Sequence, residues 1–188
     1  MNKVLATSLV GCAICASGSA LAQVGAQAPT QQPQYFTVRV GAAFALDSKL
    51  SNLSSTYFGL GADYTFSRQW FKNGETFLSI DWLTNMSGGH TRFNWFPICI
   101  NERLFTNSSS NVGTNVGNNG QTYFFVGLGG AYFDNIQQFG FGGRAGVGYQ
   151  FAGNFVAEAA FTATVPTRQP NRVTGDSLGL YIGYKFGG

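Results

Sequence analysis

Charged side chains are scarce in this chain, and six of them occur inside segments where apolar residues alternate with small or polar ones. Each of the six falls on the small or polar side of its segment. Acidic and basic groups in one confined space can form a packed ion-pair network, or they can line a narrow path for water and ions. The sequence favours the packed network, with Arg39 and Asp63 paired directly or diagonally on neighbouring strands. The six residues are Arg39, Asp63, Asp81, Arg144, Glu158 and Lys185.

Other residues that could do chemistry lack the context that their chemistry needs. His90, the only histidine, lies in the segment GGHTRF, and no rule of spacing makes the nearby Ser87 its partner. Gly140-x-Gly142-x-x-Ala145 imitates a dinucleotide fingerprint, but it lies inside a strand pattern with no helix after it. No Cys and His residues have the spacing of a metal site. We expect no cofactor, no metal and no enzymatic activity.

The six charged residues lie within a set of eight segments of period-2 alternation, a pattern typical of β-strands. In the third segment, Phe77 and Leu83 interrupt the pattern. In the fourth, Phe93 and Trp95 begin an apolar face that Ile98 continues in the opposite phase, so we expect a β-bulge at Pro97. The predicted strands cover residues 35–46, 56–67, 75–86, 92–105, 122–133, 139–151, 155–165 and 177–186. Polar loops are expected at 47–55, 106–121 and 166–175.

The small or polar face decides between two barrel architectures. A soluble, lipocalin-like barrel turns its large apolar residues inward, whereas a membrane barrel turns them outward to lipid. Only 10% of the residues are charged, where soluble domains carry about 25%. Glycines at 127, 129, 140, 142, 146 and 148 suit a crowded lumen better than a surface in water. The prediction is an all-β fold, an eight-stranded antiparallel up-and-down transmembrane β-barrel.

Aromatic residues near the strand ends support the same orientation, because aromatic girdles mark the two interfaces of a membrane barrel. One predicted girdle contains Tyr35, Phe36, Phe66, Phe105, Tyr123, Phe124, Phe151, Phe155, Tyr184 and Phe186. The other contains Phe44, Phe58, Trp82, Phe93, Trp95, Tyr132, Phe139 and Phe161.

The first 34 residues have a different character from the rest. A lysine, an apolar run and Ala20-Leu21-Ala22 form the pattern of a signal peptide, so we expect residues 1–22 to be removed after Ala22. A lipoprotein-like site that would leave Cys12 acylated is the less favoured alternative. Residues 23–34 read as a flexible leader and 35–186 as the barrel. The net charge of +3 comes with no basic cluster, so no nucleic-acid partner is expected.

With this pattern, residues 35 to 186 resemble the small eight-stranded outer-membrane β-barrels of Gram-negative envelopes, the OmpA/OmpX/OmpW-like group. The most specific piece is Ser177-x-Gly179-x-x-Ile182-x-Tyr184, which is similar to the signal that such proteins present to the barrel-assembly machinery. The family usually stops on the aromatic residue, whereas here Phe186 follows two residues later.

The resemblance implies a location in the outer membrane, contact with outer-membrane lipids and lipopolysaccharide, and a monomeric barrel. It implies a structural or surface-interaction role in the cell envelope, the latter through loops such as 47–55 and 166–175. A narrow, porin-like channel for small solutes or ions is the alternative. A lipid A-modifying enzyme is the third possibility, although His90-Thr91-Arg92 lacks the His-x-Ser arrangement of the deacylases.

Overall fold

A computed structural model describes residues 35–66, 74–85, 93–106, 120–134, 136–151, 154–166 and 174–186 of this 188-residue chain. The predicted signal peptide (1–22, with Ala20 and Ala22) and the predicted leader (23–34) lie outside the described residues. So does His90.

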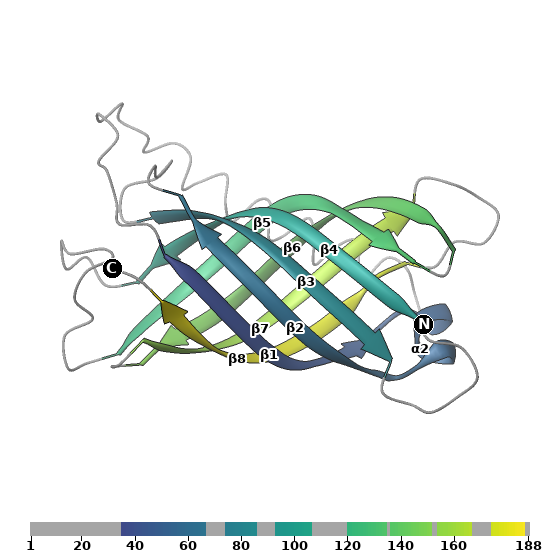
Figure 1. The fold of residues 1–188 in the computed structure, drawn as a ribbon, viewed down its shortest axis with the longest axis horizontal. Coiled ribbons are helices and arrows are strands. Elements are labelled where there is room, and N and C mark those ends of the chain that lie inside the picture. The colour runs from purple at the N-terminus through teal and green to yellow at the C-terminus, as the bar shows by residue number, and fades with distance from the viewer. Residues whose placement is uncertain are drawn as a thin grey trace. The chain divides into compact units, whose positions relative to one another are not determined.

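Eight antiparallel strands form a closed barrel in which each strand pairs with its neighbours in sequence (Figure 1). The single short helix in the described part of the chain, α2 (Ser48–Leu53), lies between β1 and β2. No helix among the described residues is long and apolar enough to cross a membrane. The strands are β1 (Phe36–Ala45), β2 (Thr56–Thr65), β3 (Gly74–Asn85), β4 (Asn94–Phe105), β5 (Gln121–Phe133), β6 (Gln138–Gln150), β7 (Phe155–Pro166) and β8 (Ser177–Phe186).

Pairing of β8 with β1 closes the barrel. Phe36 lies opposite both Tyr64 of β2 and Phe186 of β8, and the β1–β8 pairing continues to Ala45 opposite Ser177. Closure leaves no strand edge unpaired, which is the condition for strands to cross hydrocarbon. The predicted fold class is confirmed. We call the end that contains Phe36 and Phe186 the terminal end, and the opposite end the α2 end.

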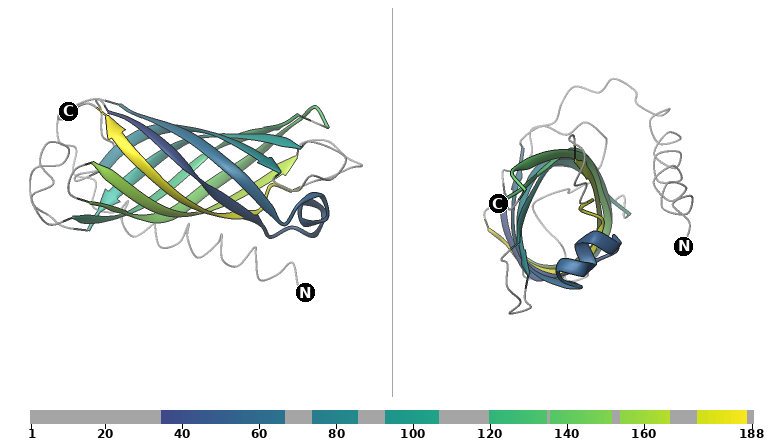
Figure 2. Two further views of the ribbon diagram at one scale, coloured as in Figure 1. Left: turned by 60° about the horizontal axis from the view of Figure 1, so that its bottom comes forward. Right: turned by 90° about the vertical axis from the view of Figure 1, so that its right-hand side faces the viewer.

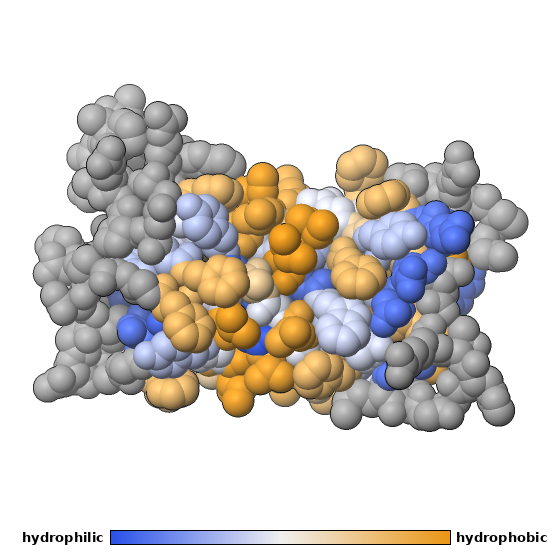
Figure 3. Space-filling view, in the orientation of Figure 1, coloured by the Kyte–Doolittle hydropathy of each residue, from blue (hydrophilic) through white to orange (hydrophobic). Residues whose placement is uncertain are grey.

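The two faces of the barrel differ as the alternation predicts. Outward side chains are large and apolar, and Leu128 and Phe141 are each 75% exposed. Figure 3 shows apolar residues across the middle of one face, with polar residues towards both ends. Arg39, in contrast, faces the lumen and is 1% exposed. A soluble monomer seldom exposes an apolar surface of this extent, so the exterior of this barrel fits a lipid environment.

The predicted bulge in the fourth strand is wrong. The register between β4 and β5 runs without a shift from Trp95 opposite Phe133 to Phe105 opposite Tyr123. Ile98 and Ile100 face outward, and Trp95 faces the lumen in unbroken alternation. The change of phase was only apparent, because Trp95 is a large apolar residue on the inner face. Phe77 and Leu83 in β3, both 1% exposed, explain the interruptions there in the same way.

The two aromatic girdles contain fewer residues than predicted, because large aromatic side chains also occur on the inner face. Outward aromatics do occur at both ends, with Phe155 and Tyr184 in edge-to-face contact at the terminal end and Tyr132 packed on Phe139 at the α2 end. Five predicted members instead lie in the lumen or against its buried clusters. They are Tyr35, Phe93, Trp95, Phe105 and Tyr123.

The segment 47–55, which the sequence analysis treats as a polar loop, contains α2. Asp47 caps the helix, because its Oδ1 accepts hydrogen bonds from the backbone N–H groups of Lys49 (3.0 Å) and Leu50 (3.3 Å). Six residues are too few to show helical periodicity, so the pattern was not visible in the sequence. The end-on view in Figure 2 shows α2 at the rim of the barrel.

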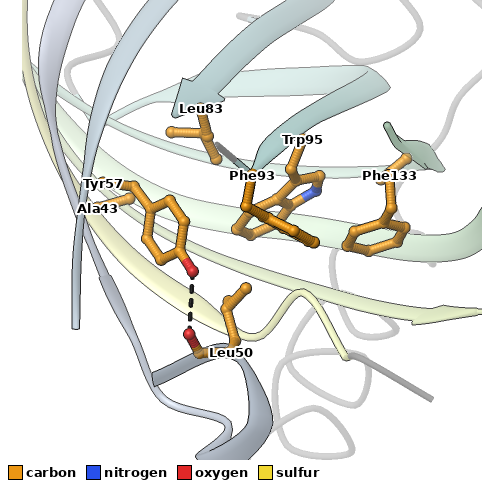
Figure 4. Close-up of a cluster of buried hydrophobic side chains, with 8 residues drawn as sticks. Ala43, Leu50, Tyr57, Leu83, Phe93, Trp95 and Phe133 are labelled. Atoms are coloured by element: carbon orange, nitrogen blue, oxygen red, sulfur yellow. Dashed lines mark hydrogen bonds between the residues drawn. The ribbon is translucent and has the colours of Figure 1, made fainter. Parts of the chain in front are cut away.

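Leu50 of α2 completes a buried apolar cluster at the α2 end of the lumen (Figure 4). The Tyr57 hydroxyl donates a hydrogen bond to the backbone oxygen of Leu50 at 2.9 Å. The Trp95 and Phe133 rings are stacked, with centroids 5.9 Å apart. We call this the mouth cluster: Ala43, Leu50, Tyr57, Leu83, Phe93, Trp95, Ala131 and Phe133.

Candidate functional site

The charged side chains of the lumen meet in one network, and Arg39 of β1 connects most of it. Its Nη2 donates to Asp63 Oδ1 at 2.7 Å and to Asp81 Oδ1 at 3.0 Å, while its Nη1 donates to Glu158 Oε2 at 3.0 Å. These carboxylates belong to β2, β3 and β7, so one guanidinium joins strands from different sides of the barrel. Such charge-assisted hydrogen bonds are stronger than neutral ones.

Arg144 and Arg103 extend the network from β6 and β4. Arg144 Nη1 donates to Asp81 Oδ2 at 3.0 Å, and its Nη2 lies 3.5 Å from Glu158 Oε2. Arg103 Nη1 donates to Glu75 Oε2 at 3.2 Å, and its Nη2 lies 3.5 Å from Glu158 Oε1. Glu158 is therefore paired with three arginines, and these pairs offset the free-energy cost of burying its carboxylate.

Tyr123 and Lys185 bring in the two remaining strands. The Tyr123 hydroxyl of β5 donates to Glu158 Oε1 at 2.7 Å, and Lys185 Nζ of β8 donates to Glu75 Oε1 at 3.4 Å. Every strand of the barrel thus contributes a side chain to the network. The ion-paired groups are Arg39, Arg103, Arg144 and Lys185 against Asp63, Glu75, Asp81 and Glu158, so their formal charges balance.

Aromatic rings pack against the cations from the sides. The Arg103 guanidinium carbon lies 4.5 Å from the ring centres of both Phe77 and Tyr123. Lys185 Nζ lies 3.9 Å from the ring centre of Tyr35. Cation–π contacts of this kind are strongest when water is excluded. The side chains in the ion pairs are no more than 3% exposed, so the network fills this part of the lumen.

Glycine makes room for the central ion pairs. Gly61 lies on β2, directly opposite Arg39 of β1 on one side and Asp81 of β3 on the other. A Cβ at this position would collide with Asp81 Oδ1 and would lie 3.1 Å from Arg39 Nη2. The missing side chain therefore allows the two charged groups to meet over the strand between them.

The structure places all six charged residues that the sequence singles out in this network. It adds Glu75, Arg103 and Tyr123, none of which the sequence pattern had placed in a lumen network. Glu75 and Arg103 have the same phase as their inward neighbours Asp81 and Asn101, so the alternation itself contained the signal. Tyr123 was assigned to a girdle, because an aromatic residue near a strand end looks the same in sequence on either face.

The residues of the predicted assembly signal all lie in β8. Ile182, Tyr184 and Phe186 face outward, at 66%, 37% and 50% exposure. Ser177 is buried on the inner side, and Gly179 lies where the Tyr181 ring leaves no space for a side chain. The outward residues form part of the apolar surface at the barrel seam between β8 and β1.

A closed barrel with an apolar exterior and a charge-paired lumen is a transmembrane β-barrel. No family model matches this chain, and no curated protein sequence matches it either. Among solved structures, neisserial surface protein A (NspA) is similar at 16% identity and a TM-score of 0.53, over 81% of this chain and 95% of that one. The fold is that of the small eight-stranded outer-membrane β-barrels.

Two further structures were also found. Ail, the attachment invasion locus protein of Yersinia pestis, has 14% identity and a TM-score of 0.47, over 82% of this chain and 99% of that chain. The N-terminal β-barrel domain of Pseudomonas aeruginosa OprF has 15% identity and a TM-score of 0.47, over 83% of this chain and 99% of that chain.

Proposed function

We propose that this protein is a monomeric, non-enzymatic barrel of the outer membrane that serves the cell envelope as a structural or surface-interacting component. The fold and the apolar exterior support the location. The closed pairing of all eight strands supports a monomer, because no strand edge is left for a second copy. Lipids and lipopolysaccharide are the proposed partners of the exterior, and the barrel-assembly machinery is the proposed partner of β8 during biogenesis.

The observation that carries the proposed role is the closed lumen. The balanced ion-pair network occupies the lumen from all eight strands, and the mouth cluster fills the α2 end. An open pore needs a continuous path of water past its charged groups, whereas here those groups are paired with one another. A filled lumen stiffens the barrel and leaves its rims and loops as the surfaces for interaction.

The location and the barrel can be tested together. Membrane fractions are separated and run on a denaturing gel with and without boiling. The expected result is a protein in the outer-membrane fraction whose unboiled form migrates differently from the boiled chain. A soluble periplasmic protein without this shift would overturn the proposal.

The closed lumen can be tested through Cys99, which faces the lumen and is 2% exposed. The experiment uses a variant without Cys12 and Cys15, so that Cys99 is the cysteine that is labelled. A water-soluble maleimide should react with Cys99 far more slowly in the folded protein than in denaturant. The Ser79→Cys variant, in a Cys99→Ser background, samples the same closed lumen from β3 and should be equally slow. Rapid labelling of both sites in the folded barrel would contradict a closed lumen.

A narrow channel is the second candidate, and the unequal contacts within the network favour it. Arg103 Nη2 lies 3.8 Å from Asp63 Oδ2, much farther than the 2.7 Å contact between Arg39 and Asp63. A rearrangement of the longer contacts could open a path for ions. Conductance in planar bilayers that changes on Arg39→Gln or Asp63→Asn would support this function. An enzymatic role would instead require a lipid A mass change that depends on His90.

A further inference from the structure

The mouth cluster has the composition of a binding site for a small apolar molecule. The cluster combines four aromatic rings, those of Tyr57, Phe93, Trp95 and Phe133, with the aliphatic side chains of Leu50 and Leu83, and Leu50 reaches it from the side of α2 (Figure 4). Each of the four rings is no more than 2% exposed. Ligand pockets in proteins are typically lined by apolar and aromatic side chains with a few placed polar groups.

The element that supplies Leu50 is held weakly. Helix α2 has six residues, well below the roughly 12–15 that an isolated helix needs for marginal stability. Leu50 is its only buried residue, and Leu53 on the same helix is 42% exposed. One apolar side chain and the 2.9 Å hydrogen bond from Tyr57 to the Leu50 backbone connect the helix itself to the mouth cluster. The residues that flank the helix are anchored separately, because Leu46 N–H donates to Asp176 O at 2.8 Å and Ala45 N–H donates to Ser55 O at 3.0 Å. Displacing α2 therefore breaks few contacts.

Two polar atoms beside the cluster have no hydrogen-bond partner. Trp95 is 0% exposed and its Nε1 donor is unpaired, and Thr164 is 1% exposed with an unpaired Oγ1. Both side chains border Gly175, where a Cβ would collide with Thr164 Oγ1 and lie 2.9 Å from Trp95 Cε2, the ring carbon bonded to Nε1. A buried donor without a partner loses its hydrogen bonds to water and gains none in return, so a ligand acceptor would stabilise it.

We propose that the mouth is a binding site for a small, uncharged, mainly apolar molecule with one hydrogen-bond acceptor, and that α2 is its lid. Leu50 occupies the place of the apolar body in the closed form. The ligand acceptor takes the hydrogen bond of Trp95 Nε1, and opening of the lid frees the Tyr57 hydroxyl as a second donor. The mouth cluster contains no charged side chain, and the carboxylates of Asp47 and Asp176 near the helix disfavour an anion.

The site is distinct from the proposed envelope role, because the ion-pair network lies deeper in the lumen. A bound molecule would be held at the mouth rather than passed through the barrel. If the mouth binds no ligand, the closed barrel and its proposed location are unaffected. If the location or the closed lumen is wrong, the fractionation and maleimide experiments show it instead.

The test uses the 15N-labelled full chain in lipid nanodiscs and follows the indole N–H resonance of Trp95, identified with Trp95→Phe. The probes are cyclohexanone and methylenecyclohexane, which have similar shapes but differ in the carbonyl acceptor. Cyclohexanone should shift this resonance in a saturable manner, and methylenecyclohexane should bind at least threefold more weakly. Equal binding of the two probes would overturn the role of Trp95.

Two variants separate the lid from the pocket. Leu50→Ala should bind cyclohexanone at least tenfold more tightly than wild type, because the side chain that competes with the ligand is gone. Leu53→Ala, on the exposed side of the same helix, should bind as wild type does and controls for partition of the probe into lipid. Binding to Leu50→Ala with none to wild type at saturation would overturn the proposal, since Leu50 would then be a permanent plug. No shift in either protein would overturn it as well.

Discussion

Arg39 and Asp63 are diagonal neighbours on adjacent strands, joined by a 2.7 Å hydrogen bond across a glycine. Arg39 is directly opposite Gly61, and Asp63 is directly opposite Thr37, two residues away along β1. Diagonal side chains in a sheet are farther apart than direct partners, and only a long side chain reaches across. The guanidinium does so and is then in position to meet Asp81 and Glu158 as well.

Removal of the Arg39 charge should destabilise the barrel strongly. Arg39→Gln leaves Asp63, Asp81 and Glu158 without their shared partner, and breaking a buried ion pair on one side costs roughly 3–5 kcal/mol. The free energy of unfolding, measured in urea from lipid vesicles, should fall by an amount of this order. Lys185→Gln is the matched control, because within the described ranges Lys185 pairs with one carboxylate, that of Glu75 at 3.4 Å. A larger loss in the control than in Arg39→Gln would contradict the central position of Arg39.

Filling the space at Gly61 should also destabilise the barrel. Gly61→Ala puts a methyl group against Asp81 and Arg39, and overpacking of a filled interior costs typically about 1–3 kcal/mol. Gly143→Ala is the comparison, because Gly143 has outward phase on β6 and an added Cβ there would come no closer than 3.0 Å to another atom. Unfolding in urea should show a clearly smaller loss for Gly143→Ala. Equal losses would mean that the lumen has spare room at Gly61.

The cost of a charge on the outer face should depend on depth in the bilayer. Leu128 lies in the middle of β5 and is 75% exposed on the exterior, so Leu128→Arg should cost about 2–4 kcal/mol in lipid. Leu46 follows the last residue of β1 and is 58% exposed, so Leu46→Arg near the interface should cost about 0–1 kcal/mol. Unfolding from vesicles gives both values. Similar costs would show that the lipid does not surround the barrel at mid-height.

Acidification should stabilise the α2 end through Asp176. Burial raises the pKa of the Asp176 carboxyl, and the nearby Asp47 carboxylate raises it further. Because the pKa is higher in the folded state, this group stabilises the fold at low pH, and the contribution is lost as pH rises through the raised pKa. Asp176→Asn should therefore raise the melting temperature relative to wild type at pH 7.5 and lose that advantage near pH 4.

Circular dichroism melts at the two pH values measure this difference. The subtraction of Asp176→Asn from wild type removes the titration of all other groups. An unchanged difference between the two proteins at pH 4 and pH 7.5 would show that Asp176 ionises as it does in the unfolded chain.

The strand content, the closed barrel and the inward position of the six charged residues were determined by the sequence alone. The side-chain period of a strand is two, and hydrocarbon admits strands only as a closed barrel, so the alternation predicted both the eight strands and their inner face. Arg39, Arg144 and Glu158 could be placed in the lumen on this basis. At Pro97 and Phe77, where residue type suggests a break in the alternation, the strands keep it.

Only the tertiary structure decided which groups meet inside the barrel. Glu158 contacts Arg39 from 119 residues away, and this pairing depends on the stagger of the strands and on closure, which no local pattern contains. The inward aromatics at the α2 end have the same residue types as outward girdle aromatics, so Trp95 could not be assigned by type. Leu50 seals the mouth from a helix too short to leave a periodic signal, because tertiary packing rather than sequence propensity stabilises it.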